Sequence, residues 1–63
     1  MMFEFTINGK KYCMTDDKIE RRAYAKKYAL MQYLPEDKVW IFRMEVDNIE
    51  EAKAHAKNYF GLS

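Results

Sequence analysis

One cysteine and one histidine form the only pair of residues in this chain that could serve as a thiol nucleophile and its base. A nucleophile of this kind needs its base within hydrogen-bond reach. Cys13 belongs to a predicted strand and points to the side of the sheet that no predicted helix covers. His55 belongs to a helix predicted over the opposite side, so the sheet is expected to separate the two groups. We therefore predict no catalytic residues and no enzymatic activity.

A metal site is predicted to be absent as well. Glu51 and His55 are four residues apart and share one face of a predicted helix. Two ligands fall short of the four that close a structural zinc site. The acidic pairs at 16–17, 36–37 and 50–51 stand at predicted helix starts or in a loop, where helix capping and solubility explain them. We expect neither a metal nor a bound cofactor.

The segment 18–27 concentrates positive charge, with five basic residues and one acidic residue. In a helix, Arg22 and Lys26 would lie four residues apart, a spacing at which like charges repel slightly. A bound phosphate or acidic partner would relieve that repulsion, although an ordinary solvated helix face is the alternative explanation. Tyrosines interleaved with cations are typical of surfaces that bind single strands. The residues proposed for a protein partner are Arg21, Tyr24 and Tyr28, and those for a nucleic acid are Arg21, Arg22, Lys26 and Lys27.

A second candidate surface lies on the strand predicted over 38–46, where apolar residues occur on both sides. One side, expected in the core, carries Trp40, Phe42, Met44 and Val46. The other side, expected to be uncovered, carries Val39, Ile41, Arg43 and Glu45. A solvated sheet face prefers polar residues. The β-branched Val39 and Ile41, together with Arg43, are therefore predicted to bind a protein partner or a second copy of the chain.

A β-hairpin is predicted over 3–14. Asn8-Gly9 favours a type I′ turn, in which both central residues have positive φ. With a two-residue loop, Phe5 lies opposite Tyr12. The core side of the hairpin then carries Phe3, Phe5, Ile7, Tyr12 and Met14. The other side carries Glu4, Thr6, Lys11 and Cys13.

Two helices are predicted, over about 17–33 and from 47–48 to 60. The first segment is rich in helix formers and lacks glycine and proline, and Pro35 ends it. The second starts at Asp47 or Asn48, each three residues before a glutamate, and stops at Gly61. The order β-β-α-β-α predicts an α+β fold. We expect a three-stranded antiparallel sheet in the order 2-1-3, with both helices packed on one face.

The length, net charge and apolar runs of the chain limit which classes of protein it can belong to. The 63 residues predict one domain, 1–63, with a small core. The net charge of +1 is not that of a dedicated DNA-binding protein, although residues 1–34 carry +3 and residues 35–63 carry −2. A single cysteine favours a reducing compartment. The longest wholly apolar run is 39–42, so we expect a cytoplasmic protein without a membrane span.

The segment 45–53 is similar to a strand-to-helix join that is common in small bacterial and phage proteins. This similarity covers about a seventh of the chain. It implies a bacterial or phage source and no particular function. The leading hypothesis is a non-catalytic protein-interaction module, such as a small phage-type inhibitor or adaptor, with a homodimer as one form of the interaction. It would act through the uncovered sheet face or the exposed side of the first helix. The alternative is a weak nucleic-acid binder that uses the basic segment 18–27.

Overall fold

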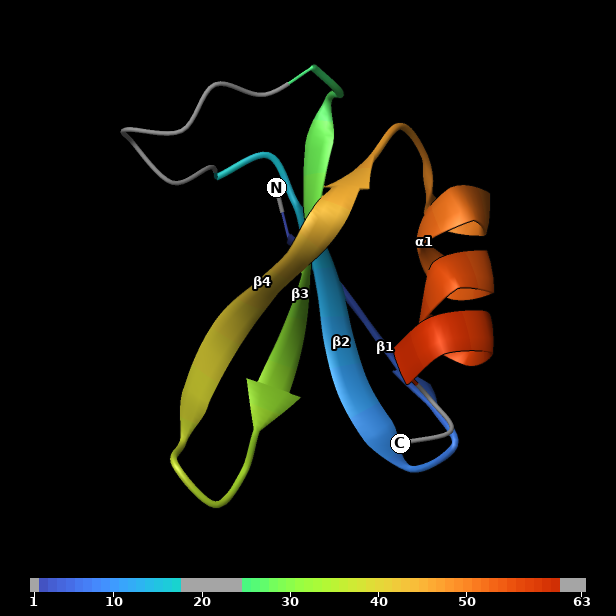
Figure 1. Ribbon diagram of the computed structural model, residues 1–63. Helices are drawn as coiled ribbons and strands as arrows, with labels where there is room; N and C mark the ends of the chain where they lie inside the picture. Colours follow the sequence, from blue (N-terminus) through green and yellow to red (C-terminus); the bar gives the residue numbers. More distant parts are fainter. Residues whose placement is uncertain (1, 18–24, 61–63) are drawn as a thin grey trace.

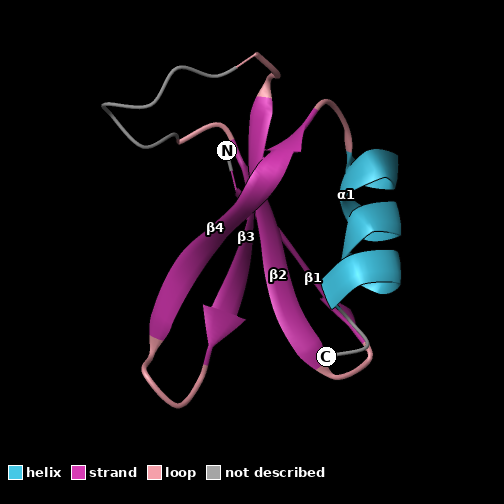
Figure 2. Ribbon diagram, viewed as in Figure 1, coloured by secondary structure: helices cyan, strands magenta, loops and turns pink. Residues whose placement is uncertain are grey.

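The protein forms one four-stranded antiparallel sheet with a helical segment packed on one side (Figures 1 and 2). The computed structural model describes residues 2–17 and 25–60, with the backbone alone at 59 and 60. The strands, which neighbour one another in chain order, are β1 (Met2–Ile7), β2 (Lys10–Thr15), β3 (Tyr28–Leu34) and β4 (Val39–Val46). The last described elements are the helix α1 (Ile49–His55) and the π-helical turn η1 (Ala56–Phe60), which continues it. In the described part of the chain, no helix is long and apolar enough to cross a membrane.

The predicted hairpin is confirmed, including its register. Phe5 is opposite Tyr12, and Ile7 is opposite Lys10. Asn8 and Gly9 have φ values of 52° and 75°, as a type I′ turn requires. The hairpin therefore separates its two sides as the sequence predicts, with Phe5 and Tyr12 on the side of α1. Phe3, which was predicted on the core side, is 45% exposed and does not belong to the core.

The predicted three-stranded sheet in the order 2-1-3 with two helices is wrong, because the structure has four strands and one helical segment. The error lies in the helix predicted over about 17–33. Its last part, Tyr28–Leu34, is the strand β3, and residues 18–24 lie outside the described chain. β3 is central, with β2 and β4 on its two edges. Pairing on both sides outweighs the modest helix propensity of its alanine, leucine and methionine residues.

β4 contains a β-bulge at Arg43. Met44 is opposite Leu30, whereas Phe42 is opposite Met31, the next residue of β3. β4 therefore has one residue more than β3 over this stretch. An inserted residue shifts the alternation of side chains by one position.

Because of the bulge, the side chains of β4 before Arg43 lie on the sides opposite to those predicted. Trp40 and Phe42 face away from α1, and not into the core as predicted. Val39 and Ile41, which are opposite Leu34 and Gln32, lie on the side of α1 instead of the uncovered side. The residues beyond the bulge, Met44 and Val46, face α1 as expected.

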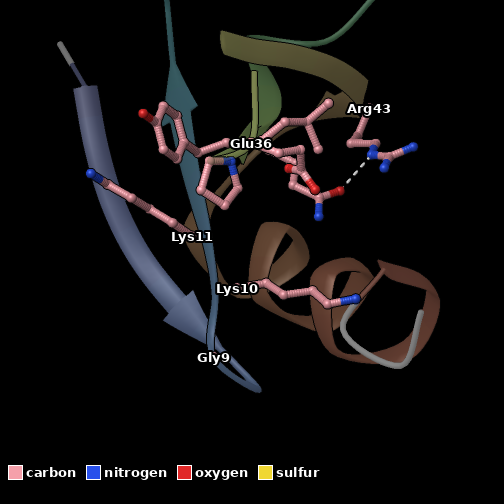
Figure 3. Close-up of a pocket in the computed structure, with 9 residues that line it drawn as sticks. Gly9, Lys10, Lys11, Glu36 and Arg43 are labelled. Atoms are coloured by element: carbon pink, nitrogen blue, oxygen red, sulfur yellow. Dashed lines mark hydrogen bonds between the residues drawn. The ribbon is translucent and has the colours of Figure 1, made fainter. Parts of the chain in front are cut away.

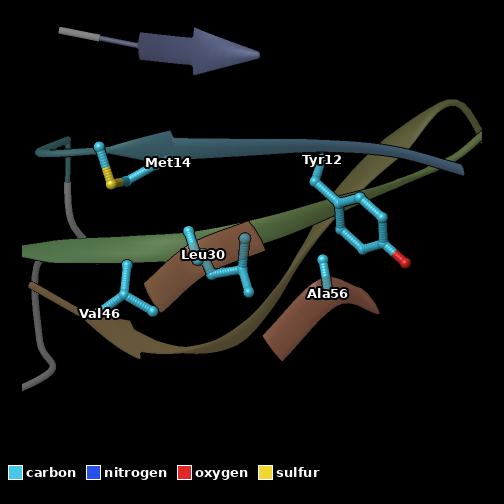
Figure 4. Packing of buried hydrophobic residues seen from close by; sticks show 6 residues of the cluster. Tyr12, Met14, Leu30, Val46 and Ala56 are labelled. Carbon is cyan, nitrogen blue, oxygen red and sulfur yellow. The ribbon is translucent and has the colours of Figure 1, made fainter. Parts of the chain in front are cut away.

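The core lies between the sheet and the helical segment. Its buried members are Tyr12, Met14, Leu30, Val46, Ala52 and Ala56. Figure 4 shows the side chains of Tyr12, Leu30 and Val46 between the strands and the helical ribbon. Ala52 and Ala56 are four residues apart, so one narrow stripe of small side chains lets the helix backbone approach the sheet closely. Ile49, at the start of the helix, packs against the same core beside these two buried alanines.

The start of α1 follows the predicted capping chemistry. The Asn48 side chain accepts a hydrogen bond from the Glu51 N–H at 2.8 Å, so Asn48 is the N-cap. The Glu51 carboxylate accepts one from the Asp47 N–H at 2.7 Å. The same carboxylate forms an ion pair with Lys26 at 2.9 Å, which connects the segment before β3 to α1.

Candidate functional site

The side of the sheet opposite α1, called here the open face, carries an unusual number of aromatic side chains. Cross-strand register places Cys13 beside Met31, Met31 beside Phe42, and Tyr33 beside Trp40 on this side. Among the described residues, no helix or strand packs on it. Tyr33, Trp40 and Phe42, the aromatic cluster, are each only partly buried. A sheet face exposed to water usually carries polar residues, so this surface is a candidate for contact with another molecule.

A lysine lies over the aromatic cluster. The rings of Tyr33 and Trp40 have centroids 5.2 Å apart and are tilted by 56°. Lys11 Nζ lies 5.2 Å from the Tyr33 centroid and 5.7 Å from the Trp40 centroid, within the range of cation–π attraction. The same amine pairs with Glu4 at 3.3 Å. Both partners of that ion pair are about half exposed, so the pair is weak and exchanges readily with other partners.

A cleft opens beside the aromatic cluster, where β2 and β3 diverge. The pairing of these two strands ends at Tyr12 and Gln32. Beyond that point a cleft of about 570 Å³ lies between the strands. We call it the β2–β3 cleft. It is lined by Gly9, Lys10, Lys11, Gln32, Tyr33, Leu34, Pro35, Glu36 and Arg43 (Figure 3).

Three cations and one carboxylate line this cleft, which gives it a positive balance. Lys10 and Lys11 are consecutive in β2, so they extend to opposite sides of the strand, as Figure 3 shows. Arg43 donates from Nε to Gln32 Oε1 at 2.8 Å. Gln32 is 6% exposed, so a buried side chain holds the guanidinium in place. The bulge is what brings Arg43 to this position.

The structure places the residues proposed for a protein partner in different surroundings. Val39 is exposed and Ile41 partly buried, both on the side of α1. Arg43 lines the β2–β3 cleft. Tyr28 packs against the core, so it does not form an outward helix face. Arg21 and Tyr24 lie outside the described residues.

The residues proposed for a nucleic acid are not brought together in the part of the chain that can be described. Lys26 is committed to the ion pair with Glu51, which raises its pKa through that hydrogen bond and correspondingly lowers the pKa of Glu51. Lys27 is exposed in a bend before β3. Arg21 and Arg22 lie outside the described residues.

Cys13 and His55 lie on different sides of the sheet. Cys13 is 1% exposed on the open face, and burial, aided by the carboxylate of Glu4, raises the pKa of its thiol. His55 is in α1, on the other side. Across the described ranges 2–17 and 25–60, no three His, Cys, Asp or Glu side chains gather closely enough to hold a metal ion. Glu51, the other residue considered as a ligand, instead caps α1 and pairs with Lys26.

Sequence reasoning missed Tyr33, Trp40 and Phe42 as site residues. Tyr33 fell at the end of a predicted helix, and the other two were assigned to the core. One signal was available: the continuous apolar run 39–42 ends at Arg43, and only after it do apolar and polar residues alternate, as Met44, Glu45 and Val46. Because β4 is apolar on both sides, the sequence fits an uninterrupted strand equally well, and the bulge becomes visible only from the pairing with β3.

No family model matches this chain, and neither a curated protein nor a solved structure matches it significantly.

Proposed function

We propose that this protein is a non-catalytic binding module that holds another protein against its open face. The observation that carries the proposal is the aromatic cluster with Lys11 above it. Tyrosine and tryptophan are the residue types that contribute most often to the binding energy of protein interfaces, because they offer large apolar area with few rotatable bonds. Here they lie side by side and only partly buried on a sheet face.

The surroundings of the cluster support the same proposal. Lys11 and Glu4, which pair at the surface, supply polar groups beside the aromatic rings. An apolar centre with a polar rim is the usual arrangement of a protein-binding surface. The buried core on the other side of the sheet is formed by residues other than Tyr33, Trp40 and Phe42, so a substitution in the aromatic cluster leaves that core intact.

A capture experiment with matched variants tests this function. The wild-type chain and its variants are immobilised and exposed to a nuclease-treated lysate of the cells that produce the protein. We expect Trp40→Lys to lose proteins that the wild type retains, because a charge replaces the central ring. Val39→Lys is the control, since Val39 is 45% exposed on the other side.

If the proposal holds, Trp40→Lys loses the captured proteins and Val39→Lys retains them. Retention of the same proteins by Trp40→Lys and the wild type would contradict it. Circular dichroism of each variant must show the wild-type fold, so that a loss of binding reports on the surface.

A further inference from the structure

We propose that two copies of this chain associate through the outer edge of β1, which joins their two four-stranded sheets into one. β1 and β4 are the two edge strands of the sheet (Figure 1). Among the described residues, no strand pairs with the outer side of β1. This edge is a different surface from the aromatic cluster, so the inference goes beyond the proposed function and does not depend on it.

The two edge strands differ in how they are protected against further pairing. Natural edge strands are commonly shielded by bulges, prolines or lysines. β4 has its bulge at Arg43, which interrupts regular pairing. β1 pairs with β2 in an unbroken register, and its sequence MFEFTI contains no lysine or proline and one charged residue, Glu4. The outer edge of β1 is therefore the edge better suited to accept another strand.

The hairpin register determines which backbone groups of β1 face outward. Residues that flank a two-residue loop form a hydrogen-bonded pair, and such pairs alternate with non-hydrogen-bonded pairs along antiparallel strands. Ile7 is opposite Lys10, so the odd-numbered residues of β1 direct their backbone groups toward β2. The N–H and C=O groups of the even-numbered Glu4 and Thr6 consequently point away from β2, where a strand of a second copy can bind them.

The side chains of β1 are complementary to a second copy in one antiparallel register. A twofold axis through Phe5 places this residue opposite Phe5 of the second copy and Phe3 opposite Ile7. These three apolar residues lie on the α1 side of their own sheet, so they meet on one side of the joined sheet. The same register places Glu4 opposite Thr6. A register centred on Glu4 would place two glutamates opposite each other, which is unfavourable.

The exposure of Phe3 supports this contact independently. Alternation along β1 places its side chain on the α1 side, where Phe5 and Ile7 pack against the core, yet Phe3 is 45% exposed. In the dimer it would pack on Ile7 of the second copy, in a non-hydrogen-bonded pair, whose side chains lie closest. The dimer therefore buries an aromatic ring that the single chain leaves in water. Such burial matters for a domain of 63 residues, whose core is small.

Analytical ultracentrifugation of the full chain over a range of concentrations tests the inference with two variants of Thr6. Thr6→Glu places like charges opposite Glu4 twice in the dimer, so we expect the dissociation constant to rise by roughly two- to thirtyfold. Thr6→Lys places opposite charges there and should lower the constant by a similar factor. Ala54→Glu and Ala54→Lys are the controls, because they make the same changes in net charge at an exposed position of α1.

The stability of the single chain should change in the opposite direction. Thr6 is opposite Lys11 within the hairpin, so glutamate at this position attracts Lys11 and lysine repels it. A destabilised fold therefore cannot explain a weaker Thr6→Glu dimer. Thr6→Pro gives a second test, because it removes an outward N–H and an edge strand tolerates proline there. We expect it to retain the wild-type circular dichroism spectrum and to weaken the dimer about tenfold or more.

Nuclear Overhauser effects between isotope-labelled and unlabelled copies identify the contact itself. Phe3 and Ile7 are four residues apart in β1, about 13 Å along the strand, which is too far for an effect within one copy. We expect effects from the Phe3 ring of one copy to the Ile7 methyl groups of the other.

Three results would overturn the inference. The first is a wild type that stays monomeric at about 1 mM. The second is a dimer whose dissociation constant does not respond to the Thr6 variants. The third is a dimer that Trp40→Lys dissociates and Thr6→Glu does not, since the two copies would then meet through the open face. Loss of captured proteins in Trp40→Lys tests the proposed function separately, because that variant leaves the edge of β1 unchanged.

Discussion

Tyr12 shows how a single buried atom affects the stability of so small a protein. Its side chain is fully buried in the core and stacks on Phe5, with centroids 5.7 Å apart. Its hydroxyl oxygen is buried and has no hydrogen-bond partner in the described part of the chain. Burial also raises the pKa of this hydroxyl, although the charge of Arg43 acts against that shift. A buried hydroxyl without a partner costs free energy relative to an apolar group of the same shape.

The first prediction follows from this cost. Tyr12→Phe should leave the free energy of unfolding unchanged or raise it, by up to about 1–3 kcal/mol. Leu30→Ala, which removes a fully buried side chain from the same core, should instead lower it by about 2–5 kcal/mol. Chemical denaturation of the two variants measures both effects. A clear loss of stability in Tyr12→Phe would show that the hydroxyl makes a stabilising hydrogen bond.

The turns provide a second prediction at the scale of residues. Gly9 has φ of 75°, and a Cβ added there would meet nothing within 4 Å. Gly9→Ala should therefore lower the free energy of unfolding by about 1 kcal/mol through backbone strain alone. Lys38, in the turn between β3 and β4, has φ of 56°. Lys38→Gly removes the same strain and should leave the thermal midpoint equal or higher. Equal losses in both variants would contradict this explanation.

At the scale of a single element, the open face depends on the bulge in β4. It turns Trp40 and Phe42 outward while Met44 and Val46 stay in the core. Deleting Arg43 would restore uniform alternation and force one of these two apolar pairs onto the wrong side. We expect the deletion to unfold the domain, because half of the strand would lose its packing.

A substitution at the same position separates the bulge from the arginine. Arg43→Ala retains the extra residue and loses the hydrogen bond to Gln32, so we expect a cost of about 1–2 kcal/mol. Thermal unfolding followed by circular dichroism compares the two variants. A deletion variant as stable as Arg43→Ala would show that the strand has no bulge.

The elements also show what local sequence can and cannot predict here. The hairpin of β1 and β2 and the cap at Asn48 depend on nearest neighbours, and both were predicted correctly. β3 could not be recognised in this way, because Leu30 and Leu34 share a side at both helical and strand spacing. Only pairing with β2 and β4, which lie far along the chain, decides between the two. The aromatic cluster escaped prediction for the same reason, since it depends on the bulge.

At the scale of the whole molecule, the ion pair of Lys26 and Glu51 connects segments that are 25 residues apart in sequence. The hydrogen bond from Lys26 lowers the pKa of Glu51, so the pair stabilises the fold above the unfolded-state pKa of that carboxyl. The contribution is lost as the pH falls through the lowered folded-state value. The pKa of Lys26 is raised, so the contribution is also lost when the pH rises through that value.

The shifted pKa values of Lys26 and Glu51 predict that their ion pair contributes to stability at neutral pH and not at acid pH. Lys26→Met should have a lower thermal midpoint than the wild type at neutral pH, and the difference should vanish at about pH 2, where carboxyl groups are protonated. High salt should reduce the difference, because both groups are near the surface. Lys57→Met serves as the control for a lost surface charge. A difference that persists at acid pH would mean that Lys26 acts through packing of its stem.

The aromatic cluster and the proposed protein partner both require that Trp40 lies on the open face of the sheet. Trp40 is the only tryptophan in the chain, so its indole protons give unambiguous NMR signals. We predict nuclear Overhauser effects from the indole to the Tyr33 ring and the Lys11 methylenes, and none to the methyl groups of Ala52 or Leu30. Contacts from the indole to Ala52 or Leu30 would place Trp40 in the core and contradict the open-face site.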